Sequence, residues 1–163
     1  MLAVIAPGQG SQTPGMLNSW IDDAESKSLL GSWSDAIGLD LLALGTTADA
    51  DEIKDTANAQ PLIVAAGLLS ARALGIENYS VTSGHSVGEL TVAALSSAIS
   101  HEDALRLVRA RGLEMAKAAA QQPSGMAAVL GGERSDVISA LNGLGLIAAN
   151  ENGGGQIVAA GDL

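Results

Sequence analysis

The order of apolar and polar positions predicts strands separated by helices along the first part of the chain. The run LAVIA, residues 2–6, is apolar throughout and stops at Pro7, which is typical of a strand buried in a parallel sheet. Residues 79–83 form a second strand-like run that leads into the stretch GHSVG. Most residues between these runs have a helical pattern, including a helix expected to begin at Pro61 and to end at Gly75. This order predicts an α/β fold with a parallel sheet.

Helical spacing continues after the GHSVG stretch. We expect one helix over residues 86–98 and another over residues 101–119, with Ser100 and Asp103 forming a capping box at the start of the second helix. The second helix repeats its apolar positions at helical spacing, which predicts a face packed on the core. These positions are Leu105, Val108, Gly112 and Met115.

The pattern changes after the break QPSG at residues 122–125. The predicted elements that follow are a strand, a helix and two strands, at residues 126–132, 135–145, 146–150 and 156–161. This series matches the first part of a ferredoxin-like β-α-β-β-α-β unit, whose last helix and strand we do not find in the sequence. We therefore predict two domains, an α/β core over residues 1–124 and an incomplete ferredoxin-like subdomain over residues 125–163.

The composition narrows the possible functions. Aromatic residues make up 2% of the chain and Phe is absent, so the core must be built from Ala, Leu, Ile and Val. No Cys is present, which excludes disulfides, thiolate metal sites and cysteine catalysis. The formal net charge of −10 opposes binding to nucleic acid. The chain starts without a basic segment and has no apolar run long enough to span a bilayer, so we expect a cytoplasmic protein without a membrane partner.

The few cationic side chains are clustered. Four of the eight Lys and Arg residues fall within twelve positions, and these are Arg106, Arg109, Arg111 and Lys117. Such a cluster is either the solvated face of one helix or a local positive patch for an anionic substrate or partner. The periodicity alone leaves both alternatives open.

The stretch GHSVG, residues 84–88, has the form G-x-S-x-G. Where a strand turns sharply into a helix, this pattern places the serine oxygen in an exposed position above the sheet. A strand-like run precedes the stretch and a helical run follows it, as such a turn requires. We therefore predict that Ser86 is a nucleophile, with a purely structural serine as the alternative. A serine nucleophile also needs a base and hydrogen-bond donors for the oxyanion that forms.

Two hexapeptides indicate a family. PGQGSQ at residues 7–12 and GHSVGE at residues 84–89 together resemble the malonyl-CoA:acyl carrier protein transacylases, to which the acyltransferase domains of polyketide synthases are related. The chain resembles the N-terminal portion of these enzymes, which implies an α/β-hydrolase-like core that carries the ferredoxin-like subdomain. Further matches follow in the family's order at NAQP (58–61), RARG (109–112), GMAAVLG (125–131) and AANENGGGQIVAAG (148–161).

The resemblance implies roles for five residues. Ser86 would carry the malonyl group as an ester, and the backbone N–H groups of Gln9 and Val87 would form the oxyanion hole. Arg111 would bind the free malonyl carboxylate, since a guanidinium offers two parallel donors to a carboxylate. Gln60 would line the substrate pocket. The partners implied are malonyl-CoA and acyl carrier protein, in fatty acid or polyketide synthesis, with no metal and no bound cofactor.

The catalytic base is expected to lie outside this sequence. The chain has two histidines. His85 is adjacent to Ser86, and neighbouring side chains on such a turn point in different directions, while His101 is expected at the surface near a helix cap. The resemblance places the family's catalytic histidine beyond residue 163. Three alternatives stay open. They are the acyltransferase piece of a polyketide synthase, a serine esterase or thioesterase that uses the same turn, and a catalytically silent truncated fragment of such an enzyme.

Overall fold

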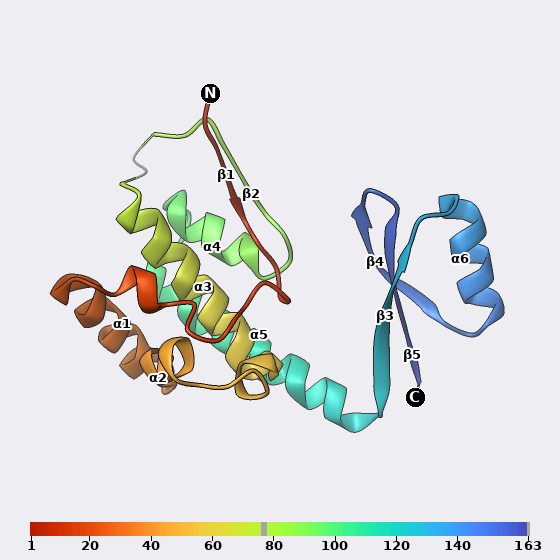
Figure 1. Cartoon of the computed structure of the whole chain (residues 1–163), viewed down its shortest axis with the longest axis horizontal. Helices are drawn as coiled ribbons and strands as arrows, with labels where there is room; N and C mark the ends of the chain where they lie inside the picture. The colour runs from red at the N-terminus through yellow and green to blue at the C-terminus, as the bar shows by residue number, and fades with distance from the viewer. Residues whose placement is uncertain (76–77, 163) are drawn as a thin grey trace. The chain divides into compact units, whose positions relative to one another are not determined.

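A computed structural model describes residues 1–75 and 78–162 of the chain (Figure 1). The chain divides into two compact units, Met1–Ala116 and Lys117–Leu163, of which Leu163 lies outside the described residues. The sequence places the division between residues 124 and 125, whereas the units divide inside the long helix α5 (His101–Gln121). Each unit combines helices and strands, so the chain is a mixed α/β protein.

Two parallel strands form the sheet of the first unit. β1 (Ala3–Ala6) pairs with β2 (Val81–Gly84) in parallel, with Ala6 opposite Gly84. The parallel pairing predicted from the two apolar runs is confirmed. The carboxyl ends of parallel strands meet at one edge of a sheet, so the segments that follow the two strands lie side by side. The N–H of His85 donates to the carbonyl of Ala6 at 3.0 Å at this edge.

The core of the first unit is built around α3 (Thr56–Ala73). Most side chains from Ala59 to Leu69 are buried, so this stretch of the helix has no solvated face. The core consists mainly of Leu, Ile, Val and Ala, as the composition predicts. The other helical segments of the unit are η1 (Asn18–Trp20), α1 (Ala24–Ile37), α2 (Leu41–Thr46), η2 (Glu52–Lys54), α4 (Gly88–Leu95) and α5.

The prediction that α3 begins at Pro61 is wrong. The helix begins at Thr56, where the Asp55 carboxylate accepts a hydrogen bond from the N–H of Ala57 at 2.7 Å. Pro61 lies inside the helix and has no N–H to donate to the carbonyl four residues earlier, which belongs to Ala57. Arg109 Nη1, on α5, donates to that carbonyl at 2.8 Å. A side chain from another helix thus replaces the hydrogen bond that proline removes.

Replacing Arg109 by methionine is expected to lower the free energy of unfolding by about 1–3 kcal/mol, because the Ala57 carbonyl would lose its partner. Urea unfolding of Arg109→Met measures this loss. The control is the same substitution in a Pro61→Ala background, in which the restored N–H offers the carbonyl another donor, and the loss should be smaller there. Equal losses in the two backgrounds would mean that Arg109 stabilises the fold through other contacts.

The boundaries of the next two helices follow from local backbone chemistry. α4 is shorter than the predicted span 86–98, because Ser86 and Ser97 have φ angles of +53° and +60°, which a right-handed helix does not accommodate. At the start of α5, Ser100 caps the helix as the predicted capping box requires, and the Asp103 carboxylate returns to the Ser100 hydroxyl. The N–H of Asp103 donates to Ser100 Oγ at 3.0 Å, and the Ser100 hydroxyl donates to the Asp103 carboxylate at 2.7 Å.

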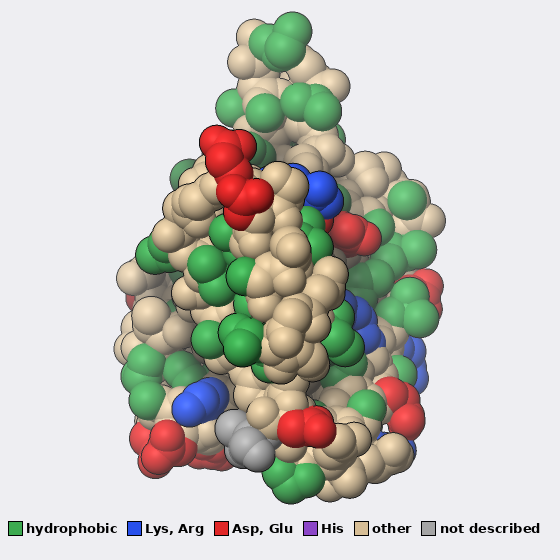
Figure 2. Space-filling model, turned by 90° about the vertical axis from the view of Figure 1, so that its right-hand side faces the viewer, with side chains coloured by type: hydrophobic (Ala, Val, Ile, Leu, Met, Phe, Trp, Pro, Cys, Tyr) green, Lys and Arg blue, Asp and Glu red, His purple; other side chains and the backbone are tan. Residues whose placement is uncertain are grey.

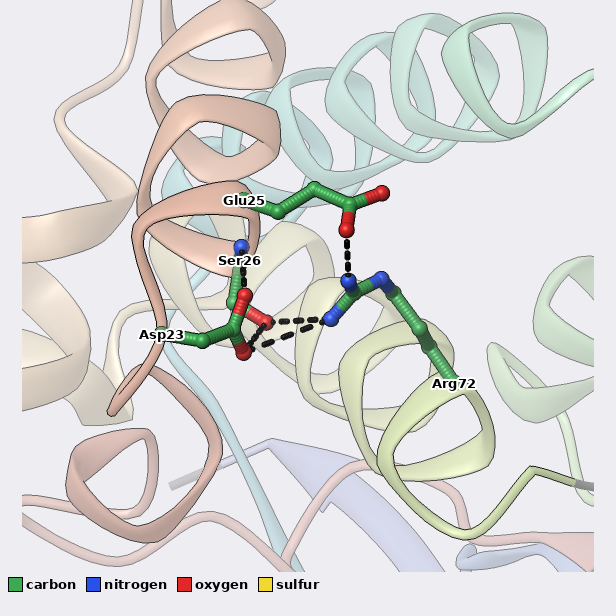
Figure 3. Close-up of polar contacts among 4 residues, drawn as sticks. All are labelled: Asp23, Glu25, Ser26 and Arg72. Atoms are coloured by element: carbon green, nitrogen blue, oxygen red, sulfur yellow. Dashed lines mark hydrogen bonds and ion pairs between the residues drawn. The ribbon is translucent and has the colours of Figure 1, made fainter.

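A polar cluster joins the last turn of α3 to the first turn of α1 (Figure 3). The Asp23 carboxylate caps α1 and accepts hydrogen bonds from the backbone N–H and the hydroxyl of Ser26, at 2.8 and 2.7 Å. Arg72 donates to Ser26 Oγ at 2.8 Å and forms ion pairs with Asp23 and Glu25. The Ser26 hydroxyl and backbone N–H, helped by the charge on Arg72, lower the pKa of Asp23 from 3.8 to about 2.

Protonation of Asp23 is expected to destabilise the fold in acid. A carboxyl group whose pKa is lowered in the folded state stabilises the fold above its unfolded pKa, and this contribution disappears as the pH falls through the folded value. The window therefore runs from about pH 4 down to about pH 2. Within it, the urea midpoint of the wild type should fall more steeply than that of Asp23→Asn. Asp22→Asn is the matched control and should follow the wild type; parallel curves for all three proteins would contradict the prediction.

The second unit contains a three-stranded antiparallel sheet and one helix. Its elements are β3 (Ser124–Leu130), α6 (Arg134–Gly143), β4 (Ile147–Gly153) and β5 (Gln156–Asp162). The strand order is β3-β5-β4, so the last strand lies in the centre and is antiparallel to both neighbours. Leu141 of α6 packs against Ile157 and Ala159 of β5 and forms a small core. The predicted order of strand, helix and two strands is confirmed.

The sheet of the first unit has uncovered apolar positions. β1 borders a mainly apolar cavity of about 240 Å³ whose other walls are formed by α3 and α4. The side chains of Ile5 and Val81 are 76% and 51% exposed. Within residues 1–75 and 78–162, no third strand pairs with β1 or β2. Parallel sheets are usually buried on both faces, so this pair is unusually open.

Candidate active site

Ser86 is an exposed residue on the turn between β2 and α4. Its φ angle of +53° lies in the left-handed region, which residues other than glycine rarely occupy. The carbonyls of His85 and Ser86 accept hydrogen bonds from the N–H groups of Gly88 and Glu89, each at 3.0 Å. A strand on one side and a helix on the other thus hold the serine in a strained conformation, which is the geometry expected of a nucleophile turn.

Close packing explains both glycines of the G-x-S-x-G pattern. A Cβ atom on Gly84 would lie 2.3 Å from the backbone nitrogen of Glu89. A Cβ atom on Gly88 would lie 2.4 Å from the carbonyl oxygen of Ala6 and 2.6 Å from that of Pro7. All of these neighbours are backbone atoms, which cannot rotate away as a side chain can. Glycine at the two positions therefore allows α4 to start directly against the ends of both strands.

The glycine-rich loop after β1 packs against the same turn. A Cβ atom on Gly8 would lie 2.4 Å from Nδ1 of His85, so the imidazole lies against this loop. Ser11 Oγ donates to the carbonyl of Gly8 at 2.9 Å, and Gln12 Nε2 donates to the carbonyl of Ile53 at 3.3 Å. The two predicted motifs, PGQGSQ and GHSVGE, are therefore neighbours in the fold.

The backbone N–H groups of Gln9 and Val87 belong to these two segments. Among the described residues, no hydrogen bond uses the backbone N–H of Gln9 or of Val87. Val87 follows Ser86 and directly precedes α4, so its N–H lies at the positive end of that helix. Gln9 lies in the loop that packs on His85. Free N–H groups on the two segments flanking a serine oxygen are suited to stabilise an oxyanion.

The guanidinium of Arg111 connects the serine to a buried amide. Arg111 Nη2 donates to Ser86 Oγ at 3.1 Å, and Arg111 Nη1 donates to Gln60 Oε1 at 2.6 Å. Gln60 is completely buried, whereas Ser86 is exposed. Helix α5 therefore places a cation beside the predicted nucleophile, and α3 supplies the amide that holds it.

The amide nitrogen of Gln60 also has partners. Gln60 Nε2 donates to Gln9 Oε1 at 3.3 Å and to the Sδ atom of Met115 at 3.2 Å. Gln9 Nε2 donates in turn to Thr56 Oγ1 at 3.0 Å. The sequence predicts Gln60 as a pocket-lining residue, and in the structure its amide contacts Arg111, Gln9 and Met115. A continuous chain of hydrogen bonds thus leads from Thr56 to Ser86.

Three clustered cations of α5 have three separate environments. Arg106 forms an ion pair with Glu102, one helical turn earlier, at 2.6 Å. Arg109 binds the carbonyl of Ala57, and Arg111 binds Ser86. The face of the molecule in Figure 2 shows both acidic and cationic side chains at scattered positions, and the formal net charge of the chain is −10. Arg111 is therefore a local attractive charge for an anionic group in an acidic protein.

The two histidines have other neighbours. The ring of His101 packs edge-on against Trp33 with the centroids 6.0 Å apart, and the residue is exposed as predicted. The ring of His85 lies against Gly8. In the part of the chain that the structure describes, no group of three His, Cys, Asp or Glu side chains is arranged to hold a metal ion. The helices of that part are all too short or too polar to cross a membrane.

Sequence reasoning does not identify Thr56 and Met115 as part of this arrangement. Met115 is predicted as a buried position of α5, but the residue is 43% exposed and accepts a hydrogen bond from Gln60. Its spacing of four residues from Arg111 puts both on one face of the helix, and this spacing is the signal that could have found it. Thr56 meets Gln9 only through the tertiary fold, so no local signal marks it.

Comparisons with known proteins agree on one family. The acyl transferase domain family matches residues 4–162. A malonyl CoA-acyl carrier protein transacylase of Mycobacterium tuberculosis is 50% identical over 168 residues, which cover 100% of this chain and 56% of the relative. The crystal structure of MCAT from Mycobacterium tuberculosis has a TM-score of 0.93 at 50% identity and covers 99% of this chain and 55% of that chain. A type II PKS acyl-carrier protein in complex with its malonyl-transacylase has a TM-score of 0.85 at 30% identity and covers 98% of this chain and 54% of that chain.

The whole chain aligns with these curated relatives and spans about half of their length. Sequence identity and fold agree over that span, and the motifs PGQGSQ and GHSVGE lie within it. The family match, the identity to the mycobacterial transacylase and the shared fold lead to the same conclusion: the chain belongs to the acyl transferase domain family.

Proposed function

We propose that the protein containing this chain transfers a malonyl group from coenzyme A to the phosphopantetheine thiol of acyl carrier protein, through an ester on Ser86. The observation that carries this proposal is the contact of 3.1 Å between Ser86 Oγ and the Arg111 guanidinium. A nucleophile beside a fixed cation suits an acyl group that ends in a free carboxylate. The relatives support the proposal, since they are malonyl CoA-acyl carrier protein transacylases and one similar structure contains an acyl carrier protein.

The reaction proceeds by two acyl transfers. Ser86 Oγ attacks the thioester carbonyl, its bond to the carbonyl carbon forms as the carbon–sulfur bond breaks, and the proton lost by the serine leaves with coenzyme A. The carrier thiol then attacks the seryl ester and returns a proton to Ser86. The N–H groups of Gln9 and Val87 stabilise the oxyanion in both steps. Both thioesters are substrates, so the reaction requires no metal and no bound cofactor.

Arg111 selects the acyl group in this proposal. The guanidinium presents planar, parallel donors to the malonyl carboxylate, and Gln60 holds it in place. A serine esterase that acts on neutral acyl groups has no use for a cation beside its nucleophile. Arg111 therefore counts against the esterase or thioesterase alternative.

The finer description of the fold belongs to the same proposal. A nucleophile turn at the carboxyl end of a parallel strand supports an α/β-hydrolase-like core for the first unit. In the second unit, β3 and β4 are parallel to each other, flank β5 and are connected through α6. This arrangement supports the first part of a ferredoxin-like subdomain.

The general base is proposed to lie outside residues 1–163. His85 and His101 are the histidines of the chain, and their rings lie against Gly8 and Trp33. The resemblance to the transacylases supports a catalytic histidine outside this span. The reaction is proposed to occur in the cytoplasm, where both thioester carriers would be available.

The test is malonyl transfer to holo acyl carrier protein by the natural gene product that contains this chain. The intact mass of the carrier should increase by one malonyl group, and faster from malonyl-CoA than from acetyl-CoA. Carriers from a fatty acid synthase and from a polyketide synthase, offered separately, distinguish the two pathways. Ester hydrolysis without transfer would favour the esterase, and the absence of both activities would favour a silent fragment.

Residues 1–163 produced alone are expected to transfer malonyl more slowly than the natural gene product, by a factor on the order of 10⁴ or more, because they lack the proposed base. They are also expected to self-associate through the open edges and apolar face of the β1–β2 sheet. Steady-state kinetics and light scattering measure the two effects. Full-rate transfer by monomeric residues 1–163 would place the base within them.

A further inference from the structure

The two terminal nitrogens of Arg111 have unequal environments. Nη1 lies 2.6 Å from Oε1 of Gln60, a residue with no exposed surface. Nη2 lies 3.1 Å from Oγ of Ser86, which is exposed. Hydrogen bonds of a charged donor are strongest when they are short and shielded from water. Nη1 is therefore held by the protein, whereas Nη2 can exchange its hydrogen-bond partner.

The orientation of the Gln60 amide fixes which arm is anchored. Its Nε2 atom donates to Gln9 Oε1 and to Met115 Sδ, at 3.3 and 3.2 Å. Turning the amide over would place its NH₂ group against the Arg111 donors and its oxygen against the oxygen of Gln9. The first contact would be repulsive because an arginine has donors only. The second would be repulsive because two acceptor oxygens would face each other. Gln60 thus keeps its oxygen directed at Nη1, and the N–H group that it binds is not available to a ligand.

We propose that Ser86 and the free carboxylate of the acyl group compete for the Nη2 side of Arg111, so that binding of the carboxylate releases the nucleophile. This inference rests on the proposed function. The exchange breaks one hydrogen bond, from Nη2 to Ser86 Oγ, and forms another, from Nη2 to a carboxylate oxygen. No covalent bond changes, and the guanidinium remains protonated throughout.

The exchange connects recognition with reactivity. A hydrogen bond from a cation occupies one of the two lone pairs of the serine oxygen and withdraws electron density from that oxygen, which weakens its attack on a thioester carbonyl. An acyl group without a carboxylate, such as acetyl, leaves the Arg111 bond on Ser86 in place. A malonyl group removes it, because an anionic oxygen is a stronger acceptor than a hydroxyl. Gln60 is a positioning residue in this scheme, since it holds Nη1 while Nη2 contacts Ser86.

Binding of sodium malonate to the natural gene product tests the competition without any chemical step. In Ser86→Ala no hydrogen bond has to be broken, so the dissociation constant of malonate should fall by about 2- to 10-fold, the net value of one such bond. Alanine and serine both carry a Cβ atom, so the substitution does not change the strain at this positive φ angle. Acetamide, which carries an acetyl group but no carboxylate, should show no such gain.

Two further variants separate the competition from an effect of side-chain size. Ser86→Cys puts a weaker acceptor of larger size at the same place, so its dissociation constant for malonate should lie between those of wild type and Ser86→Ala. Weaker binding by Ser86→Cys than by wild type would mean that size alone matters and would overturn the proposal. In an Arg111→Ala background, Ser86→Ala should give no gain.

The remaining outcomes distinguish this inference from the function on which it rests. Equal malonate affinity of wild type and Ser86→Ala, with a loss in Arg111→Ala, would leave Arg111 as the carboxylate ligand and refute the competition. Unchanged affinity in Arg111→Ala would refute the carboxylate-binding role itself, and the competition with it.

Discussion

Replacing Ser86 by alanine is expected to abolish the malonyl-enzyme and to reduce malonyl transfer by a factor on the order of 10⁴ or more. In the proposed reaction the hydroxyl oxygen of Ser86 forms the ester, and alanine offers no atom in its place. The residual rate would come from the oxyanion donors and from substrate binding, which the substitution leaves intact. The natural gene product is incubated with malonyl-CoA and digested, and the mass of the peptide containing Ser86 shows whether it carries a malonyl group.

The control for this prediction is Ser83→Ala. Ser83 is an exposed serine on β2, three positions before Ser86, and it falls within the same stretch of sequence. This variant should keep both the label and the transfer rate. Labelling that persists in Ser86→Ala, or that disappears in Ser83→Ala, would refute Ser86 as the acylation site.

Replacing Arg111 by alanine is expected to reduce kcat/KM for malonyl transfer by about 2–4 kcal/mol of transition-state stabilisation, the cost of removing one partner of a buried charge pair. Malonyl differs from acetyl in its terminal carboxylate, and only a cation fixed in the site distinguishes the two strongly, because an unpaired carboxylate is costly to bury. Acetyl transfer should be unchanged or faster. The comparison of kcat/KM for malonyl-CoA and acetyl-CoA measures this change of selectivity.

Arg106→Ala is the matched control for Arg111→Ala. Arg106 lies on the same helix and pairs with Glu102 at the surface, so its loss removes one cation without altering the contacts of Ser86. Selectivity should be unchanged in this variant. If Arg111→Ala reduced malonyl and acetyl transfer equally, Arg111 would support the fold rather than select the substrate.

The sequence predicts the elements near Ser86 well because local patterns determine them. The two apolar runs become parallel strands, and G-x-S-x-G becomes a turn with a positive φ angle at Ser86. The sequence prediction misplaces the start of α3, because a proline in such a position usually marks the first turn of a helix. The bond from Arg109 that allows a proline inside the helix comes from a distant segment, and no local pattern shows it.

The network behind Arg111 is beyond the reach of sequence patterns for a similar reason. The network joins residues from a loop and two helices, and only the packing of the loop and of α5 on α3 brings them together. These residues are Gln9 in the loop, Thr56 and Gln60 on α3, and Met115 on α5. Gly112 allows this packing, since a Cβ atom there would lie 3.0 Å from the carbonyl oxygen of Thr56. The motif RARG thus combines a helix-stabilising arginine, a site arginine and a glycine for close contact.

The pairing of β1 with β2 has a consequence for the order of folding. It places Ala3 opposite Val81, so α1, α2 and α3 are all contained in the segment that has to close before the pair can form. Such distant pairing is slow, because the entropy of closing a long segment is lost before the contacts are gained. The strained turn at Ser86 and the loop of Gln9 meet only when this closure is complete. A folding intermediate with native helices would therefore lack the proposed oxyanion hole, and recovery of labelling at Ser86 during refolding should lag behind recovery of the helical circular dichroism signal.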